Sequence, residues 1–366
     1  MQGIAQFSKV SASSPVEFAD LNVHPDALEK GGLWLVVADF EGRIRAWRFA
    51  DRVSDTEIRS HLDSKTEQTW SGPDPKTWST SLSALEYQNA VQTTREYVRE
   101  GTIFQANICR VMSAPLPVPG SARALSKILA AGNPAPFEGF AQIETGNPES
   151  ELWLASASPE SFLQVRQNSD GTASISSSPI KGTAKTRTGI TAKDEAENIM
   201  ITDLVRNDLQ RVCEPGTVSV EGLLNYEDHP GLVHLVSTVR GQLSRNPLVT
   251  PGYWREILEL TLPPASVSGA PKAAALDVIA ELEPGPRGPY CGAIGWIDVD
   301  AGTCDLSVGI RTFWWESASA YGGPRLHFGT GAGITWGSDP VGEWQETQLK
   351  AHILIGLASY SQEAGA

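Results

Sequence analysis

The sequence predicts an α+β fold, with antiparallel strands gathered on one side and helices on the other. Two features lead to this expectation. Short alternating or wholly apolar segments come in pairs around turn residues, such as 161–167 and 173–177 around Asp170-Gly171, and are typical of β-hairpins. Longer segments between the hairpins carry apolar residues at helical spacing. The chain shows no internal repeat and no low-complexity tract.

The expected helices differ from the strands in length and in the residues that end them. The first, at 83–100, is followed by Gly101, and the second, at 193–211, by Pro215-Gly216. Further helices are expected at 253–260, 270–283 and 339–359. Strands are expected at 33–38, 43–49, 103–112, 140–144, 152–157, 161–167, 173–177, 232–243, 290–299, 303–315 and 325–328.

The composition limits the classes of function. Of 366 residues, 40% are hydrophobic, which is enough for a large core, and the length allows two domains or one large sheet-rich unit. A net charge of −14 argues against a general nucleic-acid-binding or membrane-surface role, since both need basic patches. No secretion signal and no apolar stretch of transmembrane length is evident. The four scattered cysteines are expected to be buried thiols, so we expect a cytoplasmic protein.

Two pairs of carboxylates stand at helical spacing. Asp194 and Glu197 are three residues apart, as are Glu343 and Glu346, so each pair shares one helix face. Opposed across a cleft, these faces would offer oxygen ligands suited to Mg²⁺. Such pairs are more often solvated surface, and spacing does not separate the two readings. Lys350, one turn after Glu346, is either a salt-bridge partner or a contact for an anion in the same cleft.

Small residues form two further candidate sites. Residues 329–333 read Gly-Thr-Gly-Ala-Gly between an expected strand and a helix, where backbone N–H groups could cradle an anion or simply form a tight turn. The segment is neither a P-loop nor a dinucleotide fingerprint. The second segment, 266–272, opens a helix and poses the same alternative.

Lys181 and Glu160 are the candidate reactive side chains. Lys181 lies between an apolar residue and a glycine, and burial would favour its neutral, nucleophilic amine. Most lysines in such segments are simply exposed. Glu160 follows Ser158-Pro159 and is either a positioned acid or a helix-start residue. These residues alone leave both alternatives open.

Taken together, the motifs resemble those of the chorismate-utilising enzymes, a family that includes anthranilate, aminodeoxychorismate, isochorismate and salicylate synthases. The resemblance runs from about residue 85 to residue 357. It is carried, in order, by residues 101–110, 156–160, 179–183 (Pro-Ile-Lys-Gly-Thr), 196–208, 234–238, 268–272 (Ser-Gly-Ala-Pro-Lys), 290–295, 310–312, 331–333 and 343–347.

The resemblance implies one α+β domain, a large antiparallel β-sandwich flanked by helices, with chorismate and Mg²⁺ in a deep cleft. Residues 1–80 are then expected to form a short N-terminal region that adds strands to the same fold. Residues 81–366 are expected to form the chorismate-binding catalytic region. The N-terminal region shows no evident feedback element for tryptophan.

Matched position by position, the family's site residues fall on this chain as follows. Glu197 and Glu346 match the carboxylates that hold Mg²⁺ directly, with Asp194 and Glu343 close behind through water. The groups that match substrate-binding positions are Gln105, His234, Ser266, Tyr290, Arg311, Gly331, Ala332, Gly333 and Lys350. At position 266 many relatives carry threonine, which keeps the hydroxyl.

Two positions point to one branch of the family. Isochorismate and salicylate synthases resemble each other in a lysine base where this chain has Gln105, and a glutamine cannot activate water. Anthranilate synthases have alanine where this chain has Lys181, so the chain resembles the aminodeoxychorismate synthases. In that branch the lysine adds covalently at C2 of chorismate, and Glu160 would protonate the departing C4 hydroxyl.

The resemblance also implies a partner. No amidotransferase motif is found in the chain, so ammonia would come from glutamine through a separate amidotransferase subunit. The expected product is 4-amino-4-deoxychorismate, a precursor of 4-aminobenzoate and folate or of a specialised metabolite. The alternatives are amination at C2, as in anthranilate synthase, and a catalytically silent paralogue that binds chorismate or an amidotransferase.

Overall fold

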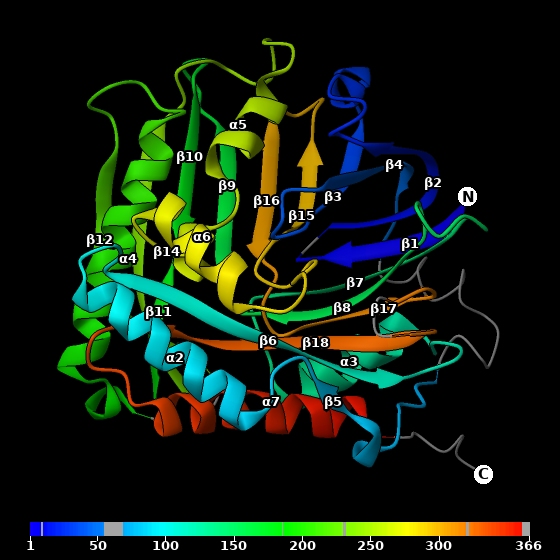
Figure 1. Cartoon of the computed structure of the whole chain (residues 1–366). Coiled ribbons are helices and arrows are strands. Elements are labelled where there is room, and N and C mark those ends of the chain that lie inside the picture. Colours follow the sequence, from blue (N-terminus) through cyan, green and yellow to red (C-terminus); the bar gives the residue numbers. More distant parts are fainter. Residues whose placement is uncertain (9, 55–68, 185, 230–231, 320–321, 361–366) are drawn as a thin grey trace.

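The fold is built on antiparallel strands whose hydrogen-bonded pairing forms one long series (Figure 1). The computed structural model describes residues 1–8, 10–54, 69–184, 186–229, 232–319 and 322–360. The first strands along the chain are β1 (Gln2–Phe7), β2 (Val10–Asp20), β3 (Leu33–Ala38), β4 (Ile44–Arg52), β5 (Ser79–Thr80), β6 (Gln105–Pro115), β7 (Phe137–Glu144), β8 (Leu152–Ser158) and β9 (Ser161–Gln167). The others are β10 (Ala173–Ser178), β11 (Ile180–Ala184), β12 (Ser219–His229), β13 (Leu232–Gln242), β14 (Gly269–Ala270), β15 (Ala293–Asp298), β16 (Thr303–Val308), β17 (Thr312–Glu316) and β18 (Arg325–Ile334).

Strands from the first and second halves of the chain are hydrogen-bonded neighbours in the sheet. From β6 the series runs through β18, β17, β8, β7, β1, β2, β4, β3, β15, β16, β9 and β10 to β13. Short strands β5 and β14 pair with β6 at one end, and β11 and β12 pair with β13 at the other. In Figure 1, β6, β17 and β18 run across the strands β9, β10, β15 and β16. The expected α+β fold with antiparallel strands and flanking helices is confirmed.

Six α-helices in the described residues flank these strands, and side-chain caps begin four of them, including α3, which Ser121 caps. Ser83 and Glu86 form a capping box at the start of α2, as do Thr191 and Asp194 at the start of α4, while Asp339 caps α7. The helices are α2 (Ala84–Arg99), α3 (Ala122–Gly132), α4 (Ala192–Gln210), α5 (Tyr253–Thr261), α6 (Lys272–Leu282) and α7 (Pro340–Ala358). Short 3₁₀ helices lie at η1 (Ala27–Lys30), η3 (Pro75–Thr77), η4 (Arg187–Gly189) and η5 (Ala265–Val267).

The hydrophobic core lies where the helices cover the strands. Leu125 of α3 and Leu354 of α7 pack in one buried cluster with Phe313 of β17 and Phe328 of β18. A larger cluster gathers the inner faces of α2, α4, α5 and α6 against strands from both ends of the series. Burying each large side chain contributes about 1.5–3 kcal/mol, so these contacts hold the helices that carry the acidic pairs.

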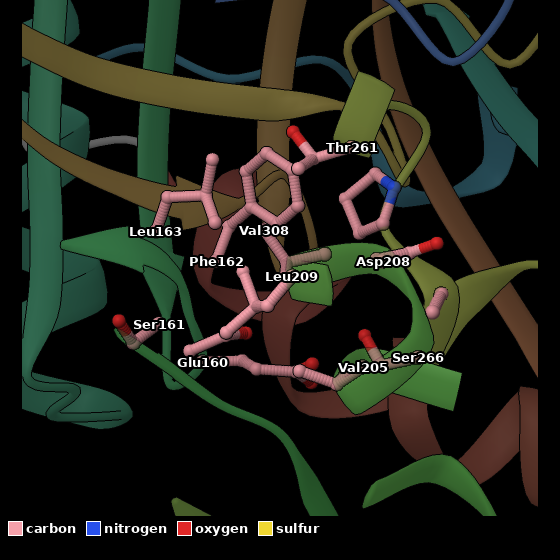
Figure 2. A pocket seen from close by; sticks show the side chains of 13 residues that line it. Glu160, Ser161, Phe162, Leu163, Val205, Asp208, Leu209, Thr261, Ser266 and Val308 are labelled. Atoms are coloured by element: carbon pink, nitrogen blue, oxygen red, sulfur yellow. The ribbon is translucent and has the colours of Figure 1, made fainter. Parts of the chain in front are cut away.

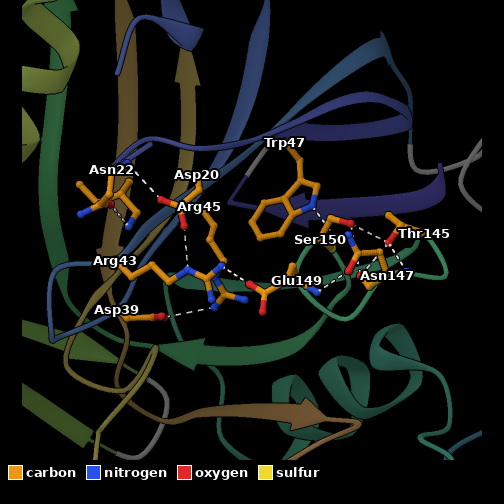
Figure 3. A network of polar contacts seen from close by, with 11 residues as sticks. Asp20, Asn22, Asp39, Arg43, Arg45, Trp47, Thr145, Asn147, Glu149 and Ser150 are labelled. Atoms are coloured by element: carbon orange, nitrogen blue, oxygen red, sulfur yellow. Dashed lines mark hydrogen bonds and ion pairs between the residues drawn. The ribbon is translucent and has the colours of Figure 1, made fainter. Parts of the chain in front are cut away.

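The N-terminal strands are tied into the same body by a polar network (Figure 3). Arg43 contacts Asp20 at 2.9 Å and Glu149 at 2.5 Å, which joins the start of β4 to the loop between β7 and β8. The buried indole of Trp47 donates to the carbonyl of Ser150 at 2.8 Å. Residues before 80 therefore supply strands and contacts to the common sheet.

The glycine-rich segment at 329–333 is not the loop that the sequence predicts. It lies inside β18, where Gly331 pairs with Cys109 of β6. A Cβ at Gly331 would lie 2.5 Å from the Cys109 sulfur, and one at Gly333 would lie 2.5 Å from Nε2 of Gln105. The glycines therefore serve close packing of two strands, a requirement that comes from the partner strand and not from the local sequence.

The expected single strand at 303–315 is also wrong, because the chain breaks at its middle. β16 pairs with β9 and β15, whereas β17 pairs with β8 and β18. Between them Arg311 has a φ of +52°, a left-handed conformation that is costly for a residue with a Cβ. The break moves the chain from one half of the strand series to the other. The sequence expectations also missed β1, β2, α3, β11 and β12.

Replacing Trp47 with phenylalanine tests the N-terminal tether. Losing the buried hydrogen bond to Ser150 should lower the free energy of unfolding by about 1–3 kcal/mol, measured by urea denaturation. Hydrogen exchange at residues 145–150 should accelerate, because that loop loses its anchor. Trp34→Phe is the matched control, since its indole donates only to nearby Gly31 at 2.9 Å. Equal exchange at 145–150 in both variants would contradict the tether.

Candidate active site

Glu160 is a carboxylic acid enclosed by groups from several elements (Figure 2). It stands just before β9 and is only 4% exposed. Its carboxyl accepts hydrogen bonds from the Ser266 hydroxyl of η5 and the Ile180 N–H of β11. Burial raises the pKa of Glu160 to about 7, although Ser266 and the charges of Lys181 and Arg311 act in the opposite direction. The group is thus a proton donor near neutral pH.

Lys181 lies on β11, half-buried, and its amine is close enough to influence two carboxylates. Its positive charge lowers the pKa of Glu160 and also that of Glu346 on α7. Its backbone is fixed from α4, because Asn198 donates to the carbonyls of Lys181 at 3.5 Å and Leu235 at 2.9 Å. The amine therefore stands between the buried acid and the acidic face of α7.

The acidic faces of α4 and α7 meet at one ammonium group. Nζ of Lys193 lies 3.6 Å from Glu197 and 3.8 Å from Glu343. Burial raises the pKa of Glu343, and the like charge of neighbouring Glu346 adds to this effect. Oε1 of Glu197 is buried without a hydrogen-bond partner. Lys193 thus links Glu197 of α4 to Glu343 of α7, and its charge also lowers the pKa of Glu346.

Lys350 links this acidic space to the glycine-rich strand. Its amine lies 2.7 Å from Glu346 and donates to the carbonyl of Gly331 at 3.0 Å. Burial acts to raise the pKa of Glu346, but Lys350, Lys193 and Lys181 together hold it below its ordinary value. Because the Gly331 carbonyl faces Lys350 and not β6, the N–H groups of Gly331 and Gly333 point to the same open edge. This edge can bind an anion.

Asp194 takes a different place from the other three acids. Its Oδ2 accepts from the N–H of Thr191 at 2.8 Å and from the Thr191 hydroxyl at 2.6 Å, so it closes the first turn of α4. Gly182, whose φ is +91°, packs against it: a Cβ there would lie 2.9 Å from the Cβ of Asp194. Asp194 therefore joins the start of α4 to the residue after Lys181.

The residues present fit a Mg²⁺ ion, although no three His, Cys, Asp or Glu side chains in the described part of the chain converge as a ready-made ligand group. Mg²⁺ commonly takes only one or two carboxylates and completes its shell with water and substrate oxygens. Oε1 of Glu197 has no hydrogen-bond partner, and the like charge of Glu346 raises the pKa of Glu343; a cation would relieve both features.

A second group of predicted residues lines the β6–β18 side. Gln105 is 1% exposed, and its Oε1 has no hydrogen-bond partner. Tyr290 is buried against Gly329, and its hydroxyl lies 3.8 Å from the sulfur of Cys109. Ala332 is buried in β18 between the two glycines. Gln105 therefore offers an unpaired acceptor in the wall that carries the glycine strand.

His234 and several unpredicted residues complete the surroundings. His234 of β13 is buried, with Nδ1 2.8 Å from the hydroxyl of Thr183 on β11. Thr183 and Asn198 lie inside motifs that the sequence singled out, but their roles depend on contacts with β13 that the motifs do not encode. Lys193 carried no sequence signal at all, because an exposed lysine on a helix is common.

Comparison with known proteins identifies the family. The model of the chorismate binding enzymes matches residues 30–356. The chain belongs to the chorismate-binding enzyme family. The match begins well before the first motif that carried the resemblance, so it includes β3 and β4 of the N-terminal region.

Relatives of this chain carry two different names. Aminodeoxychorismate synthase component 1 of Klebsiella aerogenes is 34% identical over 290 residues, covering 76% of this chain and 59% of that protein. Anthranilate synthase component 1 of Thermus thermophilus is 38% identical over 298 residues, covering 78% of this chain and 58% of that protein. The chain thus spans a little under three-fifths of the length of these curated relatives.

Solved structures agree on the fold of the family. Anthranilate synthase component I from Streptococcus pneumoniae superposes with a TM-score of 0.72 at 22% identity, over 97% of this chain and 90% of that one. The menaquinone-specific isochorismate synthase MenF of Escherichia coli superposes with a TM-score of 0.73 at 17% identity, over 98% of this chain and 88% of that one.

Within the described residues no helix is long and apolar enough to cross a membrane.

The buried acid makes stability depend on pH in a defined direction. Folding raises the pKa of Glu160 from 4.5 to about 7. The contribution of Glu160 to the free energy of unfolding is therefore fully present below pH 4.5 and is lost as the pH rises through 7. Glu160→Gln should therefore gain about 3 kcal/mol relative to the wild type between about pH 4.5 and pH 8. Urea unfolding at both pH values measures this gain. The exposed Glu214→Gln controls for net charge, and a constant difference across the range would refute the assignment.

Proposed function

We propose that this chain aminates chorismate at C4, giving 4-amino-4-deoxychorismate with ammonia supplied from glutamine by a separate amidotransferase subunit. The observation that carries the proposal is the position of Lys181, whose amine influences both the buried acid Glu160 and the acidic face of α7 through Glu346. A lysine between a proton donor and a cation-binding space is placed to attack a bound diene.

Chorismate carries two carboxylates, and the cleft offers cationic and backbone donors for them. We assign Arg311 and the open backbone edge at Gly331–Gly333 to these groups, with Lys350 and the buried hydroxyl of Tyr290 beside them. Charge-assisted hydrogen bonds of this kind are stronger and more directional than neutral ones. Ser266 and His234 would border the ring.

Mg²⁺ completes the proposed site. Glu197 and Glu346 would hold it directly and Glu343 through water, with Asp194 behind Glu197 as the cap of α4. When bound, the ion supplies positive charge that neutralises a substrate carboxylate and orients the ring. Lys193, which lies between the same carboxylates, would move aside for it.

In the proposed chemistry Lys181 and Glu160 act on opposite ends of the diene. The amine of Lys181, after losing its proton to solvent, forms a bond to C2, the double bonds shift, and the C4–O bond breaks. Glu160 gives its proton to the departing oxygen, which leaves as water; a pKa of about 7 keeps that proton available at neutral pH. Ammonia then bonds to C4, the double bonds return, and the C2–N bond breaks to release Lys181. Two successive attacks preserve the configuration at C4.

Amination at C2 is the second candidate, because the Thermus relative at 38% identity is named anthranilate synthase. An amine already bonded at C2 would block ammonia there, so Lys181 favours C4. Attack by water is disfavoured by Gln105, whose amide cannot accept the proton of an activated water. A catalytically silent paralogue would have no need of Glu160, Lys181 and the acidic space in one cleft.

Product analysis of Lys181→Ala decides among these candidates. Wild-type protein with chorismate, Mg²⁺ and ammonium at alkaline pH should form 4-amino-4-deoxychorismate, identified by mass spectrometry and by its conversion to 4-aminobenzoate. Lys181→Ala should slow C4 amination by at least about 10²-fold, since covalent catalysis is lost. The exposed Lys76→Ala is the control. Anthranilate as the main wild-type product, or an unchanged rate in Lys181→Ala, would overturn the proposal.

Metal binding is tested on the neighbouring acids of α4. Glu197→Gln should weaken binding of Mg²⁺ or Mn²⁺ by about 10-fold or more, measured by calorimetry in the presence of chorismate. Glu195→Gln removes a carboxylate from the same turn of the helix without facing Lys193 and serves as the control. If the two variants bind the metal equally well, the assignment of Glu197 is incorrect.

A further inference from the structure

A buried ion pair connects the acidic helix to the loop that carries Ser266. Nζ of Lys272, at the start of α6, lies 2.5 Å from Oδ2 of Asp208 near the end of α4. The same ammonium donates to the carbonyls of Pro263 at 2.9 Å and Thr261 at 3.2 Å. Its three N–H groups therefore each have an acceptor. Neither residue of the pair is itself among the groups proposed to bind or transform chorismate.

Burying the two charges of this pair costs free energy. The side chains of Lys272 and Asp208 are 19% and 8% exposed. Burial lowers the pKa of Lys272 and raises that of Asp208, and each is held in its charged form by the other. Buried pairs are often replaceable by apolar residues without loss of stability, so their retention is better explained by positioning.

The loop held by Lys272 leads directly to Glu160. Three residues after Pro263, the hydroxyl of Ser266 donates to the Glu160 carboxyl. Glu160, Asp208 and Ser266 also line one small cavity of about 10 Å³, whose other walls include the apolar Phe162 and Leu209 (Figure 2). In an enclosure of this size a displaced hydroxyl cannot be replaced cheaply by bulk water.

We infer that the Lys272–Asp208 pair is a positioning device that holds Ser266 against Glu160 and so sets how tightly the general acid keeps its proton. Lys272 fixes the backbone at 261–263, which fixes the hydroxyl, and the hydroxyl stabilises the carboxylate form. The other charged groups that face Glu160 are Lys181 from β11 and Arg311 from the break between β16 and β17. They are untouched by changes at the pair.

A charge-neutral double variant separates positioning from electrostatics. Asp208→Asn with Lys272→Met removes one negative and one positive charge, so the net charge near Glu160 stays the same. Release of the loop then removes the Ser266 hydrogen bond, and the titration midpoint of Glu160 should rise by about one pH unit. Asp203→Asn with Arg206→Met neutralises an exposed pair on the same helix, 2.7 Å apart, and should leave the midpoint unchanged.

The midpoint is read from the carboxyl ¹³C signal of Glu160 in the ligand-free protein, assigned with Glu160→Gln. Ser266→Ala should raise the midpoint to the same extent, and adding it to the double variant should cause no further rise. An unchanged midpoint in the double variant, or shifts that add, would overturn the inference. If the double variant does not fold, Asp208→Asn alone decides: an unpaired ammonium lowers the midpoint through its charge, whereas a displaced loop raises it.

The inference rests on Glu160 acting as the proposed proton donor. Different results would contradict the inference about the ion pair and the proposed function. In an active enzyme the alkaline limb of the pH–rate profile should shift upward in the double variant, by the same amount as the titration. A uniform loss of rate without such a shift would show a merely structural role. If the enzyme does not aminate chorismate at C4, the spectroscopic titration still tests the link between the pair and Glu160.

Discussion

The whole site depends on the way one series of antiparallel strands brings its two ends together. Lys181 lies beside β13 at one end, while the glycines of β18 lie beside β6 at the other. The described strands β13 and β18 are not paired with each other, yet the charge of Lys181 lowers the pKa of Glu346 on α7. α4 and α7 bridge the gap, because Lys193 of α4 reaches Glu343 of α7. The grouping of these residues is therefore a consequence of the way the strands and helices pack and not of any single motif.

The same packing of strands and helices also determines the pKa values of the acids at the site. An isolated buried carboxylate would be neutral, and an isolated buried amine would be costly to charge. Here Glu160 is desolvated strongly enough to keep a proton near pH 7, while Lys181 and Arg311 prevent a larger shift. Glu346 on α7 shows the opposite result. Burial acts to raise its pKa, but the neighbouring lysines lower it more and keep the carboxylate ionised. The candidate site thus contains one acid that keeps its proton near neutral pH and one that is held ionised, and the proposed reaction would use them for different tasks.

Local patterns were enough to predict most helices and hairpins, because caps, turns and periodicity are encoded by neighbours in sequence. The start of α2 at Ser83 and the limits of β9 follow from such signals. Features that depend on distant partners could not be predicted. Gly331 resembled a turn until β6 placed Cys109 against it, and the break at Arg311 follows from its two flanking strands pairing with different neighbours. The roles of Lys193 and Asn198 depend on contacts with other elements: Lys193 contacts Glu343 of α7, and Asn198 donates to the carbonyl of Leu235 on β13.

The names of the relatives divide between C4 and C2 amination, and overall identity does not resolve the division. The anthranilate synthase of Thermus is 38% identical to this chain and the aminodeoxychorismate synthase of Klebsiella 34%. Regiochemistry instead depends on which atom ammonia can reach. In the proposed reaction the amine of Lys181 is bonded to C2, so ammonia would be left with C4. A single side chain can therefore outweigh the rest of the sequence in deciding the product.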